Sequence, residues 1–117
     1  DRDMAEPPDF LLFYTGWSRF WGSNDYLESF TVPSQDLMNA IIGSSVKGVG
    51  LDGISIDPVD SIDLPNHKKI LGAGRIIIEN LKNLDKLINK KFMFSCFPLN
   101  LLNGDGSPVR AVGITDD

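Results

Sequence analysis

Apolar residues fall into short runs separated by glycine, proline and acidic residues. Residues 9–15, "DFLLFYT", are apolar nearly throughout, a pattern typical of a strand that is covered on both faces. Gly16 ends this run. The next segment, 16–26, places two tryptophans, a phenylalanine and a tyrosine among small polar residues. We predict a loop there that serves as a core flap, as the wall of an organic-substrate pocket or as a subunit interface.

A helix followed by a strand is predicted next. Ser34 is a suitable N-cap, and apolar residues then recur on one helical face until Gly43, so the helix covers about 34–43. The residues of this face are Leu37, Met38, Ile41 and Ile42. Residues 46–57 alternate glycine with valine and leucine, which predicts a strand whose glycines let another backbone come close. The order strand, helix, strand indicates a β-α-β arrangement.

A second helix and further strands are predicted in the rest of the chain. After an acidic turn over 57–65, Asp63 is a candidate cap for a helix that has Pro65 in its first turn. This helix carries His67, Ile70 and Leu71, and glycines at 72–74 end it. The predicted strands cover 75–81, 91–102 and 108–115, and a short amphipathic segment covers 83–90.

Length and charge limit the classes of protein that fit. With 117 residues, 42% of them hydrophobic, the chain can bury one core and is short for two domains. We predict a single domain over 1–117 or the C-terminal fragment of a larger domain, with residues 1–8 as a linker. The net charge of -5 argues against nucleic acid as a partner, and the absence of a long apolar run argues against a membrane.

Cys96 is the single cysteine, so the chain can form no internal disulfide. This usage fits a reducing compartment, and we predict a cytoplasmic location. Because Cys96 alternates with phenylalanines in "FMFSCFPL", we interpret it as a small buried apolar residue and not as a reactive thiol.

His67 is the only histidine, and Glu79 follows a run of isoleucines. A carboxylate in such a run must be paired, protonated or bound to a metal. The spacing of 12 residues can bring both side chains to one point at the end of a sheet, where ligands of α/β proteins collect. Imidazole and carboxylate together suit a divalent metal such as Zn or Mn.

Two ligands do not complete a catalytic site, because catalytic zinc normally has three protein ligands. The remaining ligands would be acids such as Asp57, Asp60 or Asp63, or would come from elsewhere. In the alternative interpretation, His67 is a surface or capping histidine and Glu79 pairs with Arg75 or a nearby lysine.

Four segments in order resemble the C-terminal half of the cyclase family of metal-dependent hydrolases, which includes bacterial kynurenine formamidase and isatin hydrolase. They are "FLLFYTGWSRFWG", "VKGVGLDGISIDPVDS", "NHKKILGAGRIIIENLKNLDKL" and "FPLNLLNGDGSPVRAVGI". The resemblance extends from Asp9 to Ile114. It implies an α/β fold with a mixed sheet and flanking helices, the swivelling β/β/α fold of cyclases, present here only in its C-terminal part.

The resemblance also implies a metal site. In the family, an upstream motif rich in histidine and aspartate and a later His and Glu hold one or two metal ions, and this later pair matches His67 and Glu79. The upstream motif, which also supplies the proton shuttle, is absent from this chain. The Zn or Mn ion would therefore be completed by ligands outside the chain, and no catalytic residue is assigned within it.

The implied activity is hydrolysis of a C–N amide bond by metal-activated water. The substrate would be an aryl formamide such as N-formylkynurenine, in tryptophan catabolism, or a cyclic amide. Phe13, Tyr14, Trp17 and Trp21 are candidates for the wall of an aryl pocket. We expect this chain alone to be inactive, and its partners to be the amide substrate and either further copies in a homo-oligomer or the missing N-terminal half.

The alternative function is a non-catalytic module of the same fold that works by association through the aromatic segment 13–26. A chain with only part of a sheet exposes strand edges, and such edges pair readily with a second chain.

Overall fold

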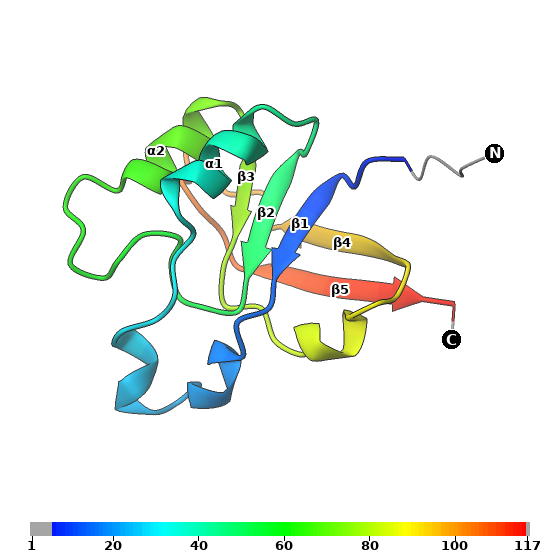
Figure 1. Cartoon of the computed structure of the whole chain (residues 1–117), viewed down its shortest axis with the longest axis horizontal. Helices are drawn as coiled ribbons and strands as arrows, with labels where there is room; N and C mark the ends of the chain where they lie inside the picture. The colour runs from blue at the N-terminus through cyan, green and yellow to red at the C-terminus, as the bar shows by residue number, and fades with distance from the viewer. Residues whose placement is uncertain (1–5, 117) are drawn as a thin grey trace. The chain divides into compact units, whose positions relative to one another are not determined.

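The computed structural model describes residues 6–116. The chain divides into two compact units, Asp1–Leu84 and Asp85–Asp117, which are described separately below (Figure 1). Residues 1–5 of the predicted linker lie outside the described residues, and residues 6–8 form neither helix nor strand. Whether the two units make up one domain stays a prediction.

The first unit is built on a parallel sheet with the strand order β1-β2-β3. Strands β1 (Phe10–Phe13), β2 (Gly48–Leu51) and β3 (Ile76–Ile78) pair in register, with Val49 opposite both Leu11 and Ile77. Helix α1 (Gln35–Ile42) connects β1 to β2, and helix α2 (Pro65–Gly72) connects β2 to β3. The predicted β-α-β arrangement and the α/β fold class are confirmed.

Three short 3-10 helices complete the regular structure. Two of them, η1 (Trp17–Phe20) and η2 (Asn24–Leu27), lie in the aromatic segment that was predicted as a loop. The third, η3 (Leu84–Leu87), lies within the predicted amphipathic segment 83–90. No helix in the described part of the chain has the length and apolar character needed to cross a membrane.

The core of the first unit lies where α1 and α2 cover one face of the sheet (Figure 1). Its buried members come from both helices, from β2 and from the loop after β2: Met38, Ile41, Val49, Leu51, Ile56 and Ile70. Ser34 caps α1 as predicted, since its hydroxyl accepts a hydrogen bond from the Leu37 N–H at 3.2 Å. Of the predicted apolar face of α1, Met38 and Ile41 are buried, whereas the side chain of Leu37 is exposed.

The glycines of β2 allow close packing on the other side of the strand. A Cβ atom on Gly48 would lie 2.6 Å from the Phe10 ring and 2.8 Å from the Ile76 carbonyl oxygen. A Cβ atom on Gly50 would lie within 2.8 Å of the Leu12 and Leu81 side chains. Real Cβ atoms do not approach so closely. The predicted close approach of another backbone is confirmed at Gly48, whereas at Gly50 the close neighbours are side chains.

The strand predicted over 46–57 is shorter in the structure. Strand β2 ends at Leu51, because its neighbours β1 and β3 end at Phe13 and Ile78 and offer no further strand to pair with. Residues 52–57 instead form a loop that begins and ends with a fully buried aspartate. This loop carries much of the site described below.

The second unit contains an antiparallel pair of strands, β4 (Phe92–Pro98) and β5 (Val109–Thr115). The strand predicted over 91–102 therefore ends at Pro98, and the strand predicted over 108–115 is confirmed. Cys96 lies in β4 and is half-buried. Burial raises the pKa of its thiol, which keeps it protonated and agrees with its interpretation as an unreactive residue.

Arg75 fixes the end of helix α1 to the start of β3. Its guanidinium donates hydrogen bonds to the backbone carbonyl oxygens of Ile41, Ile42, Ser44 and Val46. The last carbonyls of a helix have no partner within the helix, and a cation near them is favourable. The planar fork of arginine offers five N–H donors on separate nitrogens, whereas an ammonium group has only three donors on one nitrogen and cannot reach all four carbonyl groups.

We therefore expect Arg75→Lys to lower the free energy of unfolding by about 2 kcal/mol, since carbonyl groups lose their donors. Urea denaturation followed by circular dichroism measures this change. Arg110→Lys, at an exposed position of β5, is the matched control and should stay within about 0.5 kcal/mol of the unchanged protein. If both variants lost the same free energy of unfolding, the stabilising role assigned to Arg75 would be contradicted.

Candidate functional site

Helix α2 presents His67 from its first turn. Pro65 occupies the start of the helix, where its missing N–H removes no helical hydrogen bond. The next two backbone N–H groups, of Asn66 and His67, donate to the two carboxylate oxygens of Asp57 at 3.0 and 2.9 Å. A carboxylate at this end of a helix also opposes the helix dipole favourably. Asp57 thus fixes the direction in which α2 leaves the preceding loop.

The cap predicted at Asp63 is therefore wrong. In the described chain, the N-cap position belongs to Leu64, which has a φ of 46° and makes no side-chain cap bond. Asp63 is exposed. The sequence pattern could not identify Asp57 as the capping group, because six residues separate it from Leu64 and only the fold of the loop brings it back to the helix.

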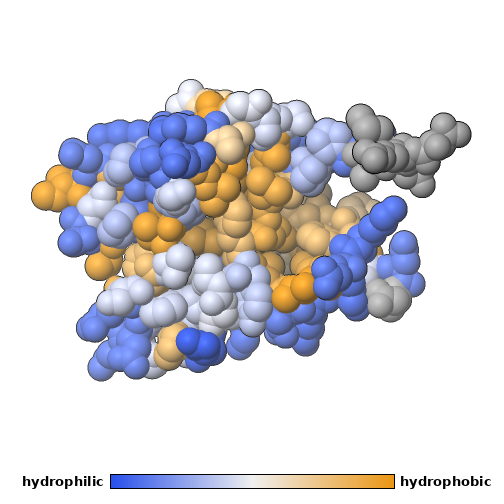
Figure 2. Space-filling model, viewed as in Figure 1, coloured by the Kyte–Doolittle hydropathy of each residue, from blue (hydrophilic) through white to orange (hydrophobic). Residues whose placement is uncertain are grey.

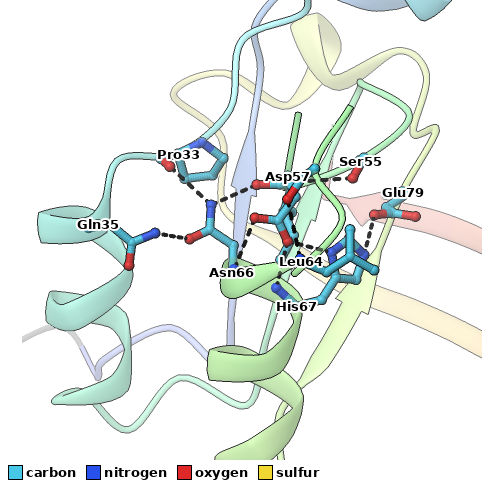
Figure 3. A network of polar contacts seen from close by, with 10 residues as sticks. Pro33, Gln35, Ser55, Asp57, Leu64, Asn66, His67 and Glu79 are labelled. Atoms are coloured by element: carbon cyan, nitrogen blue, oxygen red, sulfur yellow. Dashed lines mark hydrogen bonds and ion pairs between the residues drawn. The ribbon is translucent and has the colours of Figure 1, made fainter. Parts of the chain in front are cut away.

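Asp57, His67 and Glu79 form one line of polar contacts (Figure 3). The Nδ1 atom of His67 lies 2.8 Å from Oδ2 of Asp57, and its Nε2 atom lies 3.1 Å from Oε1 of Glu79. The Asp57 side chain is fully buried, whereas the side chains of His67 and Glu79 are 23% and 27% exposed. The two residues predicted as ligands thus meet, one from α2 and the other from the end of β3.

The surroundings of Asp57 determine which nitrogen of His67 carries a proton. Burial disfavours the charged form of Asp57, but hydrogen bonds from the backbone N–H groups of His67 and Asn66 and from the His67 ring outweigh it and lower the pKa of the carboxyl. The resulting carboxylate can only accept hydrogen bonds. Nδ1 of His67 is therefore the donor, and in the neutral ring the lone pair of Nε2 points toward Glu79.

The contact between His67 and Glu79 then needs a proton or a metal ion. Burial raises the pKa of Glu79, although the charge and hydrogen bond of His67 and a hydrogen bond from the Ile56 backbone act in the opposite direction. A lone pair on Nε2 and a carboxylate oxygen repel each other unless a proton or a metal ion lies at the contact. The geometry is therefore suited to holding a proton or a metal ion between an imidazole and a carboxylate.

The pair fits two positions in the ligand shell of a divalent metal. Ligands of a tetrahedral or octahedral metal at about 2.0–2.2 Å lie about 3.0–3.5 Å from one another. The 3.1 Å between Nε2 of His67 and Oε1 of Glu79 falls in this range. The hydrogen bond from Nδ1 to a buried carboxylate is the usual support of a metal-binding histidine.

The pair does not make a complete ligand set. Within residues 6–116, no group of three or more His, Cys, Asp or Glu side chains is placed to hold a metal ion. Asp60 and Asp63, which were considered as further ligands, are exposed. Asp57 uses its oxygens for the start of α2 and for Nδ1 of His67.

The alternative partner considered for Glu79 is not the one observed. Arg75 donates to the backbone carbonyls at the end of α1, and the contact of Glu79 is with His67. His67 is likewise not a simple surface residue, since both ring nitrogens have partners.

Asn66, which precedes His67, was not identified from the sequence. Its side chain is almost fully buried and donates to the carbonyl oxygens of Ile56 and Pro33, at 2.7 and 3.2 Å (Figure 3). Its own side-chain oxygen accepts from Gln35 at 2.6 Å. Asn66 therefore joins α2 to the start of α1 and to the loop before Asp57. Asparagine side chains are mostly exposed in proteins, so only the neighbours of Asn66 in space reveal this role.

A second network of hydrogen bonds lies at the carboxyl end of β1 and β2. Oδ1 of Asp52, directly after β2, accepts from the backbone N–H of Thr15 at 3.0 Å and from its hydroxyl. The other oxygen, Oδ2, is buried and has no hydrogen-bond partner among the described residues. Asp52 thus joins the ends of β1 and β2.

Tyr26 connects the aromatic segment to the residue after Glu79. Its hydroxyl donates to Oδ1 of Asn80 at 2.8 Å and lies 3.3 Å from the carbonyl oxygen of Asp52. Burial, and then the charges of Asp52 and Glu79, raise the pKa of Tyr26, so the hydroxyl stays protonated. Asn80 has a φ of 60° and also donates from its backbone to Gly53 at 2.9 Å. These bonds fix the turn that positions Glu79.

The four aromatic residues proposed for an aryl pocket have different surroundings. Trp17 donates from its indole to the Tyr26 carbonyl at 2.9 Å, and Phe13 packs against the core. Tyr14 and Trp21 are 48% and 62% exposed. Of these four, Trp21 lines a pocket of the first unit.

Comparisons with known proteins agree with the resemblance read from the sequence. The family model named Cyclase matches residues 2–58. An uncharacterized protein of Methanocaldococcus jannaschii is 36% identical over 97% of this chain and 58% of its own length. The kynurenine formamidase of Salinibacter ruber is 39% identical over 69% of this chain and 38% of its own length.

Solved structures show the same relationship. Isatin hydrolase A from Labrenzia aggregata, bound to benzyl benzoate, has a TM-score of 0.82 and 27% identity, with 96% of this chain and 48% of that chain covered. A potential metal-dependent hydrolase with cyclase activity has a TM-score of 0.66 and 26% identity, with 94% and 52% covered. The chain thus spans about half the length of the proteins that it matches, and the resemblance to cyclase-family hydrolases is confirmed.

Replacing Asp57 tests the arrangement at the start of α2. We expect Asp57→Asn to lower the free energy of unfolding at neutral pH by about 2 kcal/mol, since two backbone donors and the His67 ring lose a charged acceptor. Asp60→Asn, at an exposed position, is the matched control and should change little.

The pH dependence gives a second criterion. Because folding lowers the pKa of Asp57, its carboxylate stabilises the fold fully above the unfolded pKa of about 3.9, and this stabilisation is lost as the pH falls through the folded pKa. Asp57→Asn should therefore lose less stability than the unchanged protein between about pH 5 and pH 2 in urea denaturation. If Asp57→Asn and the unchanged protein lost stability identically with falling pH, the role assigned to the Asp57 carboxylate would be contradicted.

Proposed function

This chain is a relative of the cyclase-family hydrolases, and on that premise we propose that it supplies part of the active site of a metal-dependent amidohydrolase. His67 and Glu79 would be two ligands of a divalent ion, Zn or Mn. Further ligands would come from polypeptide outside this chain. The relatives named above support the proposal, because they include a kynurenine formamidase and a potential metal-dependent hydrolase.

One observation carries the proposal. Nδ1 of His67 is held by the buried carboxylate of Asp57, so the opposite nitrogen faces Glu79 with a lone pair at 3.1 Å. Asn66 and Asp57 hold the backbone that carries His67, and Tyr26 and Asn80 hold the turn that carries Glu79. Nε2 of His67 and Oε1 of Glu79 are therefore positioned before a metal binds. Binding then requires less ordering of these side chains.

A bound Zn or Mn ion lowers the pKa of a water and polarises a substrate carbonyl. The task of this chain would be to hold that ion in a fixed position at the carboxyl end of the parallel strands. His67 and Glu79 then act as ligands and not as acid and base, and Asp57 acts through His67. The proton shuttle would belong to the part of the protein that supplies the remaining ligands.

The substrate would be a small amide, either an aryl formamide such as N-formylkynurenine or a cyclic amide. This assignment rests on what relatives act on, since they are a kynurenine formamidase and an isatin hydrolase. It places the activity in tryptophan catabolism, with a cytoplasmic location. The chain by itself would be inactive, and its protein partner would be either further copies of it in a homo-oligomer or an N-terminal half that completes the fold.

A non-catalytic association module is the second candidate, and the exposed aromatic residues favour it. Trp21 and Tyr14 are about half exposed or more. The outer strand β1 is only half-buried, and Figure 2 shows apolar residues at the surface along it. Such surfaces often mark interaction sites. This function requires no metal, so metal binding distinguishes the two candidates.

In the full-length protein, we expect His67→Ala and Glu79→Gln each to weaken binding of Zn²⁺ or Mn²⁺ by more than about tenfold, because even the loss of an outer-shell partner costs that much. Isothermal titration calorimetry of the EDTA-treated protein measures this affinity. Hydrolysis of N-formylkynurenine should fall in parallel.

Glu28→Gln, an exposed position outside the site, is the matched control for Glu79→Gln and should leave both measurements unchanged. The proposal fails if the unchanged protein binds neither metal. It also fails if His67→Ala retains full metal affinity and full hydrolysis.

A further inference from the structure

Asp52 carries a buried carboxylate to which the proposed metal site assigns no role. Its side chain is fully buried and lies directly after β2. The hydrogen bonds that the carboxylate accepts from the backbone N–H and the hydroxyl of Thr15 both end on Oδ1. Oδ2 is buried as well and has no hydrogen-bond partner among the described residues. A buried carboxylate oxygen without a donor is rare in proteins and requires an explanation.

The position of Oδ2 makes the charge of Asp52 costly. A carboxylate that is removed from water regains the lost interaction energy only from hydrogen bonds or from a nearby cation. No lysine, arginine or other donor reaches Oδ2 in the described part of the chain. A proton on Oδ2 would not remove the cost, because the resulting hydroxyl would be a buried donor without an acceptor. The charge of Asp52 therefore lacks a partner that balances it.

Asp52 lies beside the turn that carries Glu79. The carbonyl oxygen of the next residue, Gly53, accepts the backbone N–H of Asn80 at 2.9 Å. The Tyr26 hydroxyl lies 3.3 Å from the carbonyl oxygen of Asp52 and donates to Asn80. Burial raises the pKa of Tyr26 most, and the charges of Asp52 and Glu79 raise it further, so both carboxylates act on the same region. A cation bound at Glu79 would therefore interact with the charge of Asp52.

We propose that Asp52 supports the metal ion electrostatically and is not one of its ligands. Its charge is unpaired in the metal-free protein and is balanced when a divalent ion binds at His67 and Glu79. Water screens this interaction little, because the Asp52 side chain is fully buried. The inference rests on the function proposed above. It adds that Asp52 raises the metal affinity at the expense of the stability of the metal-free fold.

The test compares Asp52→Asn with the unchanged full-length protein after EDTA treatment. Asparagine keeps the shape of the side chain and an oxygen that accepts from Thr15, and its neutral amide costs less to bury than a charge. If the carboxylate had only a structural role, its replacement would lower the stability of the metal-free fold. Removal of an unpaired charge has the opposite effect, because it relieves a desolvation cost.

We expect Asp52→Asn to bind Zn²⁺ or Mn²⁺ about tenfold more weakly in isothermal titration calorimetry, since a divalent ion loses a buried charge near it. The urea midpoint of the metal-free variant should equal or exceed that of the unchanged protein. Asp25→Asn is the matched control, because it removes an exposed charge next to Tyr26 in the sequence. Its metal affinity should change by less than about twofold.

Thr15→Val separates the hydrogen bond from the charge. It removes the hydroxyl that donates to Oδ1 of Asp52 and leaves the carboxylate in place. The urea midpoint of the metal-free protein should fall, because the buried carboxylate loses a donor. The metal affinity should stay within about threefold of the unchanged protein, because the charge that attracts the ion is still present.

Three results would overturn the proposal and leave the proposed function standing. The first is an Asp52→Asn variant that binds metal as tightly as the unchanged protein. The second is a lower urea midpoint for metal-free Asp52→Asn, which would make the carboxylate a structural group. The third is a Thr15→Val variant that loses about tenfold in metal affinity. If the unchanged protein bound neither metal, the proposed function would be refuted and this inference with it.

Discussion

The buried carboxylate of Asp57 is the interaction on which the site depends. It accepts hydrogen bonds from the first free N–H groups of α2 and from the His67 ring, so a single side chain determines where the helix starts and how its histidine is turned. A buried charge is costly unless every oxygen has donors. The start of α2 supplies these donors. Because the carboxylate binds Nδ1 of His67, the opposite nitrogen, Nε2, is available to a cation.

The parallel sheet brings Glu79 to the same place. Strands β1, β2 and β3 end together, and the residues directly after them are joined by hydrogen bonds between Thr15 and Asp52 and between Tyr26 and Asn80. Glu79 is thereby held on a short turn and not on a free loop. The same edge provides the pocket lined by Trp21 and Asn80, so the contact between His67 and Glu79 and this pocket share one support.

Close packing around β2 holds this edge in place. Gly48 and Gly50 leave no space for a side chain, and Val49 and Leu51 point into the core under the two helices. Arg75 adds a polar link between the end of α1 and the start of β3. The helices and the strands that carry the site are therefore fixed to one another by both apolar contacts and hydrogen bonds.

The sequence by itself determined the order of helices and strands, the cap at Ser34, the reason for Gly48 in β2 and the pairing of His67 with Glu79. These features depend on local periodicity or on a spacing that one helix and one strand can bridge. The tertiary structure alone decided the roles of Asp57, Asn66, Asp52 and Tyr26. Each of them acts on residues that are distant in sequence, and their donors and acceptors become partners only after the chain has folded back on itself.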